Sequence, residues 1–265
     1  MILETIAEAN RIRYNEIEKN VSLEQIKSKA LKLDSNTGFP FEKALSENGI
    51  SYICEVKKAS PSKGIIAEDF PYLKIAKEYE QAGASAISVL TEPKWFKGSD
   101  SYLKEIAETV KIPVLRKDFT VCEYQIYEAK LLGASAVLLI CAILDEDTIR
   151  DWIKICDSLG LSALVEAHTE EEVKTALNAG ARIIGVNNRN LKDFTVDLKT
   201  CINLRSLVPS EKLFVAESGI KTADDISDLR NAKVDAVLIG ETLMRAEDKK
   251  KALTELNGGN LNEQD

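Results

Sequence analysis

The residues of this chain that could do acid–base chemistry follow short apolar segments. Glu55 and Lys57 stand two positions apart, and Lys117, Glu166 and Glu217 each end an apolar segment of their own. Side chains two apart on a strand share one face of it. Carboxylates and ammonium groups in a partly dry pocket set one another's protonation states, as multi-step acid–base chemistry requires. Brought together by the fold, these five side chains would form a catalytic cluster.

The alternative is that each of these groups belongs to a structural ion pair. For any single residue the two interpretations are equally good. A buried charge costs several kcal/mol unless it is paired, and the starts of the same apolar segments carry no matching set of charges. Structural pairing therefore does not explain why all five groups lie at the same ends of their segments.

The apolar segments alternate with helical patterns. Gly83, Gly133, Gly160 and Gly180 each close a helical pattern and lead into an apolar segment. A glycine there supplies a left-handed helix cap, and a short apolar segment bounded in this way is a strand buried on both faces. We predict strands at residues 52–57, 86–90, 114–117, 136–140, 163–166, 183–187, 213–217 and 236–239. We predict the intervening helices at residues 72–82, 101–109, 122–132, 145–159, 170–179, 197–207, 223–231 and 242–253.

Eight such units in 265 residues predict an α/β fold of the (β/α)8, or TIM, barrel type. A doubly wound open sheet is the alternative. Residues 2–33 carry apolar positions at helical spacing, and residues 41–47 predict a further short helix. We therefore expect a helical extension over residues 1–50, the barrel over residues 51–256 and a disordered tail over residues 257–265.

Composition limits the classes of function. The net charge of −8 argues against a nucleic-acid partner, and no apolar run approaches the roughly 18 residues of a membrane span. The five cysteines are scattered without paired spacing, so we expect reduced, buried thiols and a cytoplasmic protein. One histidine, His168, argues against a multi-histidine metal site, although it could serve alone.

A phosphate site is indicated after the last two predicted strands. Ser218 and Gly219 follow one strand, and Gly240 follows the other at the start of a helix, where backbone N–H groups and the helix dipole favour an anion. The loop at residues 58–64 can add a hydroxyl group and a cation. We expect the carboxylate of Glu241 to face outward and its backbone N–H to face the ligand. Alternatively, these glycines only form tight turns.

Aromatic side chains follow the second and third predicted strands. Trp95, Phe96 and Phe119 could wall an aromatic ligand, or they could cap their loops against the body of the domain. The sequence leaves both interpretations open.

Seven motifs stand at the ends of the predicted strands, namely EVKKASPSKG (55–64), LTE (90–92), KDF (117–119), LVEAH (164–168), GVNNRNL (185–191), AESGI (216–220) and LIG (238–240). In this order they resemble the indole-3-glycerol phosphate synthase family, and the resemblance extends from residue 2 to residue 255. It implies that the helical extension packs over the barrel mouth. It also implies a step of tryptophan biosynthesis that needs no metal or organic cofactor.

The implied substrate is 1-(2-carboxyphenylamino)-1-deoxyribulose 5-phosphate. Its ring carbon that bears the carboxylate attacks the ribulose carbonyl, CO₂ leaves, and loss of water then forms the indole. By resemblance, Lys117 polarises and protonates the carbonyl oxygen. Lys57 binds the substrate carboxylate and can act as the acid in the dehydration. Glu166 assists proton movement or steadies charge on the aniline nitrogen, and Glu55 takes the final proton.

The resemblance assigns the remaining site residues to positioning and binding. Glu217 and Asn187 position hydroxyl groups and the lysines, while Arg189 lies near the anionic end of the substrate. Ser60, Gly219 and Gly240 belong to the phosphate grip, and Phe96, Phe119 and Leu238 to the walls around the anthranilate ring. Ser218 and Glu241 remain phosphate-site candidates from the loop pattern alone. The implied reaction requires a lysine that is protonated at rest, which adjacent Glu55 and Asp118 would favour and desolvation would oppose.

Two other functions remain open on the residues alone. A sugar-phosphate isomerase or a Schiff-base aldolase could use the same fold, the aldolase with Lys57 or Lys117 as a neutral nucleophile. The barrel could also be an idle phosphate-binding or assembly module. We expect a small phosphorylated molecule as the partner and a monomer as the assembly, with a homodimer as the alternative.

Overall fold

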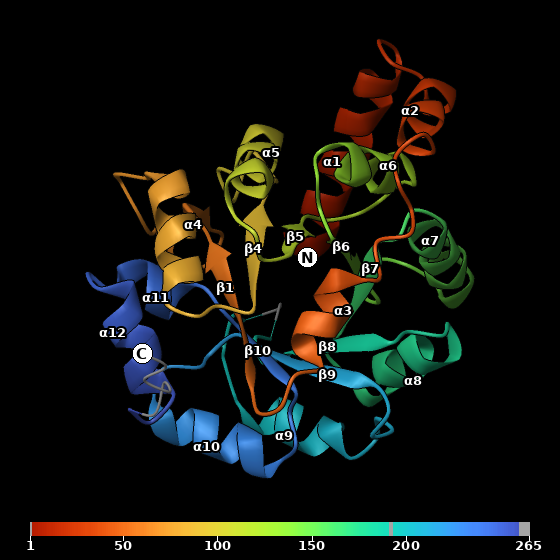
Figure 1. Ribbon diagram of the computed structural model, residues 1–265. Coiled ribbons are helices and arrows are strands. Elements are labelled where there is room, and N and C mark those ends of the chain that lie inside the picture. Colours follow the sequence, from red (N-terminus) through yellow and green to blue (C-terminus); the bar gives the residue numbers. More distant parts are fainter. Residues whose placement is uncertain (1, 191–192, 260–265) are drawn as a thin grey trace.

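Eight parallel strands close into a barrel surrounded by helices in the computed structural model, which describes residues 2–190 and 193–259 (Figure 1). The strands are β1 (Ser51–Val56), β4 (Ala86–Leu90), β5 (Val114–Lys117), β6 (Ala136–Ile140), β7 (Ser162–Ala167), β8 (Ile183–Asn187), β9 (Leu213–Glu217) and β10 (Ala236–Ile239). Cys54 of β1 pairs with Ile87 of β4 and with Ile239 of β10, which closes the ring. The predicted barrel is confirmed, and every strand lies within one residue of its predicted bounds.

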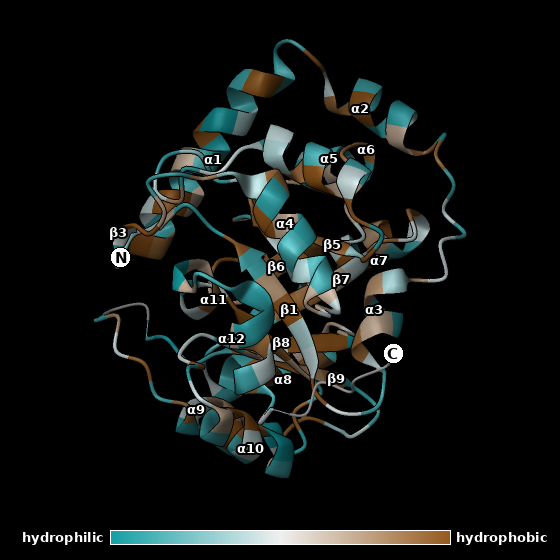
Figure 2. Ribbon diagram, turned by 60° about the vertical axis from the view of Figure 1, so that its left-hand side comes forward, coloured by the Kyte–Doolittle hydropathy of each residue, from teal (hydrophilic) through white to brown (hydrophobic). Residues whose placement is uncertain are grey.

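The strands are hydrophobic because both of their faces are buried. Side chains such as Ile53, Leu115 and Val215 fill the inside of the barrel, whereas Cys54 and Ile87 pack outward against the helices. Figure 2 shows the result, with hydrophobic strands at the centre and hydrophilic residues on the outer helices. This two-sided burial explains why the strands read as continuous apolar runs and not as alternating patterns.

The outer helices are α4 (Tyr72–Gln81), α5 (Asp100–Thr109), α6 (Tyr124–Leu131), α7 (Glu146–Ser158), α8 (Glu170–Asn178), α9 (Lys199–Arg205), α10 (Ala223–Asn231), α11 (Glu241–Arg245) and α12 (Lys249–Leu256). The single helix predicted at residues 242–253 is wrong, because the chain breaks between α11 and α12. Ala246 is extended, and the side chain of Asp248 caps α12 by accepting a hydrogen bond from the Lys251 N–H group. A short hairpin that we did not predict, β2 (Ala59–Ser60) with β3 (Gly64–Ile65), follows β1.

The extension consists of α1 (Ile2–Glu18), α2 (Leu23–Ala30) and α3 (Pro40–Leu45). The first residues of α1 line a cavity at the carboxyl ends of the strands, and α2 lies beside α6 (Figure 1). We expected the whole extension over residues 1–50 to pack over the barrel mouth, and this is wrong for α3, which lies at the opposite end of the barrel. Its Phe41 and Leu45 are buried in the inner core because they fill the amino end of the barrel.

Charged groups also lie at the amino end of the barrel. The first residues of the strands had indicated no such charges there. Arg182, just before β8, binds Glu42 of α3 at 2.8 Å and Asp157 of α7 at 2.7 Å. Both carboxylates come from helices, so the strand pattern did not reveal them.

None of the helices in the described ranges combines the length and the apolar composition that crossing a bilayer requires. At the carboxyl end of the chain, residues 257–259 form a turn in which Asn257 accepts a hydrogen bond from the Tyr52 hydroxyl group at 3.1 Å. The remainder of the predicted tail, residues 260–265, lies outside the described residues.

Candidate active site

A cavity of about 640 Å³ opens at the carboxyl ends of the barrel strands. The five predicted acid–base residues meet there, since Glu55, Lys57, Lys117, Glu166 and Glu217 all line it. The other predicted site residues also line it, namely Ser60, Phe96, Phe119, Asn187, Arg189, Ser218, Gly219, Leu238, Gly240 and Glu241. The fold therefore brings together groups that are up to 186 positions apart, from Glu55 to Glu241.

Lys117 is the central cation of the cavity. Its Nζ lies 2.8 Å from Glu166 Oε2 and 2.8 Å from Glu217 Oε2. Burial alone would lower the pKa of Lys117, but the two carboxylates more than offset burial and raise this pKa above its ordinary value. Lys117 is therefore an ammonium at neutral pH, as a proton donor must be.

The two carboxylates around Lys117 differ in their acidity. Burial raises the pKa of both, but attraction to Lys117 dominates at Glu166, whose pKa falls to about 2. At Glu217, burial together with repulsion from Glu166 dominates, so its pKa rises to about 7. The pKa values of two buried carboxylates that share one ammonium move apart in this way, because ionising both carboxylates at once is unfavourable. Glu217 is the group that takes a proton first.

Gly185 makes room for Glu217. A Cβ atom on Gly185 would lie 2.4 Å from Glu217 Oε1. This oxygen is buried and lacks a hydrogen-bond partner among the residues that the structure describes. An unsatisfied buried oxygen is costly. Glu217 Oε1 is therefore a hydrogen-bond acceptor that a ligand beside Lys117 could satisfy.

Glu55 and Lys57 form a second pair across the cavity. Lys57 Nζ lies 2.5 Å from Glu55 Oε1, and Ser88 Oγ lies 3.4 Å from Glu55 Oε2. A Cβ atom on Gly240 would lie 2.5 Å from Glu55 Oε1 and 2.7 Å from Lys57 Nζ. Gly240 therefore leaves space for this pair in addition to its predicted place in the phosphate grip.

At the predicted phosphate end of the cavity the backbone has left-handed residues and the start of a helix. Ser218 and Gly219 have φ values of 67° and 85°, and Gly240 stands before the first turn of α11. The carboxylate of Glu241 is partly exposed and is held by Arg245 at 3.1 Å and by Lys63 at 3.8 Å. These cations neutralise a group that would otherwise repel phosphate.

Sequence reasoning missed two cations at this end, Lys221 and Arg245, which also line the cavity. Their signal was available, because Lys221 follows the AESGI motif and Arg245 lies one helical turn after Glu241. Neither residue ends a strand, so the pattern of polar strand ends did not point to them.

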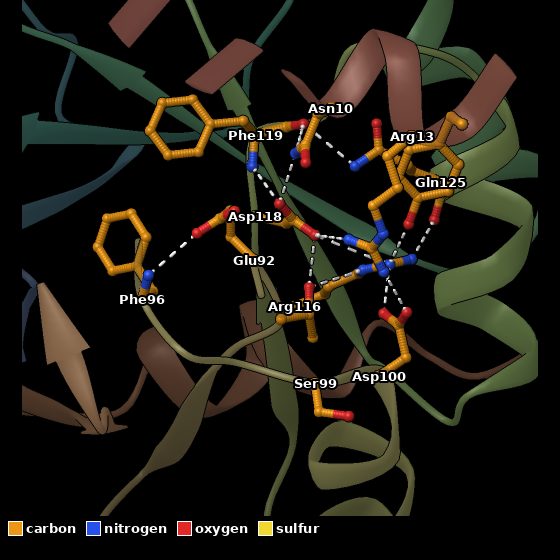
Figure 3. A network of polar contacts seen from close by, with 12 residues as sticks. Asn10, Arg13, Glu92, Phe96, Ser99, Asp100, Arg116, Asp118, Phe119 and Gln125 are labelled. Atoms are coloured by element: carbon orange, nitrogen blue, oxygen red, sulfur yellow. Dashed lines mark hydrogen bonds and ion pairs between the residues drawn. The ribbon is translucent and has the colours of Figure 1, made fainter. Parts of the chain in front are cut away.

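Two of the three aromatic residues form a wall of the cavity. The ring centroids of Phe96 and Phe119 lie 6.2 Å apart, and both residues line the cavity. Glu92 holds the loop by accepting a hydrogen bond from the backbone N–H group of Trp95 at 2.7 Å. It also accepts one from the N–H group of Phe96 at 3.0 Å (Figure 3). The Trp95 ring instead lies against Lys94, 4.5 Å from its Nζ.

A buried polar network behind Lys117 was not predicted (Figure 3). Arg116 points outward from the barrel and donates hydrogen bonds to the carboxylates of Asp100 at 2.6 Å and Glu128 at 2.7 Å. Asp118 accepts hydrogen bonds from the Asn10 side chain of α1 at 2.8 Å and from the backbone N–H group of the next residue, Phe119, at 2.8 Å. This network attaches α1 to the end of β5.

Asp118 therefore has a different role from the one we expected. Its carboxylate accepts a hydrogen bond from the Thr91 hydroxyl group at 2.6 Å on the outer side of β5. Asp118 reaches the edge of the cavity, but this network engages its carboxylate, and it is not among the main charges that raise the pKa of Lys117. The charge of Lys117 is maintained by Glu166 and Glu217.

The loop after β8 carries the asparagine motif. Asn187 Oδ1 accepts a hydrogen bond from the Arg189 N–H group at 3.0 Å, and Arg189 donates to the Phe194 carbonyl group at 3.1 Å. Asn188 points away from the cavity and donates to the Glu217 carbonyl group at 3.0 Å. Asn188 thus fixes the end of β9, from which the Glu217 side chain extends.

Comparison with known proteins agrees with this geometry. The barrel resembles the solved structures of 3-hexulose-6-phosphate synthase (TM-score 0.62, 15% identity, 79% of this chain and 99% of that chain) and thiamine phosphate pyrophosphorylase from Pyrococcus furiosus (TM-score 0.59, 20% identity, 79% and 94%). At these identities the likeness shows the fold alone.

Sequence comparison is more specific than the fold. The chain is 60% identical to an indole-3-glycerol phosphate synthase of Ruminiclostridium cellulolyticum, over 97% of this chain and 99% of the relative. It is 52% identical to the enzyme of that name from Lachnoclostridium phytofermentans, over 97% and 98%. The family model for indole-3-glycerol phosphate synthase matches residues 3–256. The chain therefore belongs to the indole-3-glycerol phosphate synthase family, the carboxy-lyases of tryptophan biosynthesis, as its motifs predicted.

Proposed function

We propose that the cavity converts 1-(2-carboxyphenylamino)-1-deoxyribulose 5-phosphate to indole-3-glycerol phosphate, with Lys117 as the acid of ring closure. The observation that carries this assignment is the position of Lys117 Nζ, 2.8 Å from each of two carboxylates and facing the cavity. The ammonium is held at a fixed point, and its proton can be replaced from a neighbouring acid.

Binding places the substrate between two ends of the cavity. The phosphate group lies at Ser218, Gly219 and Gly240, where backbone N–H groups face an anion, and the nearby cations Lys63 and Arg245 add positive charge. The anthranilate ring lies by Phe96 and Phe119, with its carboxylate on Lys57. The ribulose carbonyl group then falls near Lys117.

Ring closure and decarboxylation use Lys117 and Glu166. The ring carbon that bears the carboxylate attacks the carbonyl carbon while Lys117 transfers a proton to the carbonyl oxygen, which becomes a hydroxyl group. CO₂ then leaves, and its bonding electrons restore the aromatic ring. The carboxylate of Glu166 stabilises the positive charge on the aniline nitrogen during these steps, because its lowered pKa keeps it ionised.

Dehydration uses Glu55 and Lys57, the pair at the carboxyl end of β1. Lys57 donates a proton to the departing hydroxyl group, so that water leaves, and Glu55 accepts the proton that is released when the indole forms. The 2.5 Å contact between Lys57 and Glu55 supports this assignment, since it lets the two groups exchange a proton between turnovers.

The reaction is tested by adding the substrate and following indole fluorescence together with CO₂ release. We expect both signals, unchanged by a chelator. Absence of both would favour an idle phosphate-binding module, and inactivation by the chelator would indicate a metal. Borohydride in the presence of substrate separates the remaining alternative, because a covalent adduct on Lys57 or Lys117 would indicate a Schiff-base aldolase.

We further propose that the small phosphorylated substrate is the partner of a cytoplasmic monomer. The net charge of −8 supports the absence of a nucleic-acid partner. Sedimentation equilibrium measures the assembly directly, and a mass of about 29.3 kDa is expected for a monomer.

A further inference from the structure

The single histidine of the chain lies against a catalytic carboxylate. His168 follows β7, and its Nε2 is 3.4 Å from Glu166 Oε1. This nitrogen is buried, and within the described part of the chain it has no aligned hydrogen-bond partner. Glu166 Oε2 meanwhile binds Lys117 at 2.8 Å. The two oxygens of Glu166 are thus placed between an ammonium and an imidazole.

The other side of the imidazole is fixed by the start of α8. His168 Nδ1 lies 3.2 Å from Glu172 Oε2, and the same oxygen accepts a hydrogen bond from the His168 N–H group at 2.7 Å. Glu172 is itself held by Thr169, whose side chain caps α8 by accepting a hydrogen bond from the Glu172 N–H group. The ring orientation is therefore set by backbone and helix cap, before any substrate binds.

The surroundings of His168 favour its charged form. Burial would lower the pKa of His168, but the hydrogen bond to Glu172 and the charges of Glu166, Glu172 and Glu217 offset burial and raise this pKa above its ordinary value. Cys141 of the neighbouring loop has a raised pKa, mainly through burial, and is a neutral thiol. The charged residues that line the adjoining second cavity with His168 are Glu4, Glu172, Arg189 and Asp197.

We propose that His168 is a positioning residue for catalysis, an imidazolium that bridges Glu172 and Glu166 and holds Glu166 as an oriented carboxylate toward Lys117. The proposal rests on the roles given above to Glu166 and Lys117. His168 lines the second cavity and is not part of the lining of the first, so it acts through Glu166 and not on the substrate.

A charge-dependent role has a signature that simple packing lacks. The bridge exists only while His168 is protonated, so its contribution is complete at low pH and is lost as pH rises through the pKa of His168. His168→Asn keeps a hydrogen-bond donor near Glu166 but removes the charge. The ratio of wild-type kcat to variant kcat should therefore be about tenfold near pH 6 and decline toward one at alkaline pH, with KM unchanged.

Spectroscopy tests the bridge without turnover. Because the chain has one histidine, an NMR titration follows the His168 imidazole without overlap. We expect Glu172→Gln and Glu166→Gln each to lower the pKa of His168. Glu171→Gln, an equal change of charge at the exposed neighbouring position on α8, is the matched control and should leave this pKa unchanged.

Two results would overturn the inference. One is a kcat ratio for His168→Asn that is independent of pH, which would indicate packing only. The other is a His168 pKa that Glu172→Gln and Glu166→Gln do not move. Failure of the proposed function is distinguishable from both, because it would appear in the wild-type protein as missing indole formation while the titration still reported the bridge.

Discussion

Arg116 and Lys117 are adjacent cations on β5, and they lie on opposite sides of the barrel wall. The Arg116 side chain is 1% exposed, and its nitrogen atoms donate to acceptors on the outer helices α5 and α6 and on α1. The Lys117 side chain is 12% exposed and lies between two carboxylates beside a cavity. The protein satisfies the hydrogen-bond donors of Arg116. Lys117 instead shares its proton with the two carboxylates of Glu166 and Glu217.

This difference separates a structural charge from a catalytic one. A saturated guanidinium has a fixed geometry and cannot release a proton at neutral pH. An ammonium between a strongly acidic and a weakly acidic carboxylate can release its proton and be reprotonated, and the cavity gives a ligand access to it. Burial alone does not distinguish the two roles, because both side chains are largely buried.

The largest expected effect is on the inner side of β5. Lys117→Ala should lower turnover by about 10³-fold or more, because it removes the proton donor of ring closure. Binding of a phosphate-bearing substrate analogue should be largely retained, since the phosphate grip lies elsewhere. Indole fluorescence measures the first and calorimetric titration the second. Near-normal turnover would remove the catalytic role from Lys117.

The outer side of β5 should respond in the opposite way. Arg116→Met leaves Asp100 and Glu128 without their buried partner, so the free energy of unfolding should fall by about 3–5 kcal/mol, measured by urea denaturation. The folded fraction should keep its kcat within a few fold. If the methionine variant does not fold, Arg116→Lys, which retains the charge, replaces it. A loss of kcat without a loss of stability in either variant would contradict a purely structural role for Arg116.

The third test concerns the proton shared around Lys117. The folded-state pKa of Glu217 is raised to about 7 from an ordinary value of 4.5. The folded state therefore holds a proton that the unfolded state releases, and wild-type stability should decline between about pH 4.5 and pH 7. Glu217→Gln removes this titration, so the difference in unfolding free energy between the two proteins should change across that window. Parallel curves would contradict the raised pKa.

The smallest expected effect comes from Gly185, whose missing side chain makes room for Glu217. Gly185→Ala should displace the Glu217 carboxylate and lower kcat by roughly tenfold, since a misplacement of about 1 Å can cost up to 10²-fold. The backbone conformation of Gly185 is ordinary, so the free energy of unfolding should fall only by the cost of overpacking, about 1–3 kcal/mol. Unchanged kcat would mean that the position of Glu217 is not critical to the reaction.

The sequence predicted the barrel because its strands are marked at both ends. Glycines such as Gly83 and Gly180 close the preceding helices with φ values of 92° and 91°, and a polar residue marks where each strand reaches the mouth. The same polar residues form the cavity lining, so the fold and the candidate site were readable from one pattern.

Features that depend on packing between distant segments were not readable. Asn10 meets Asp118 across 108 positions, and nothing in the α1 sequence indicates that partner. The break between α11 and α12 depends on the Asp248 cap, and an amphipathic pattern that continues on both sides conceals it. The acidity of Glu166 and Glu217 likewise depends on distances to Lys117 that no spacing encodes.

A crystal structure with a non-reacting analogue of the carboxyphenylamino-deoxyribulose phosphate tests the central claim most directly. The quantity to measure is the distance from Lys117 Nζ to the oxygen that replaces the ribulose carbonyl. We expect hydrogen-bond distance, with Lys57 at the ring carboxylate and the phosphate group at Gly219 and Gly240. An analogue whose carbonyl position lies beyond the reach of Lys117, with Lys57 or another acid beside it, would contradict the account.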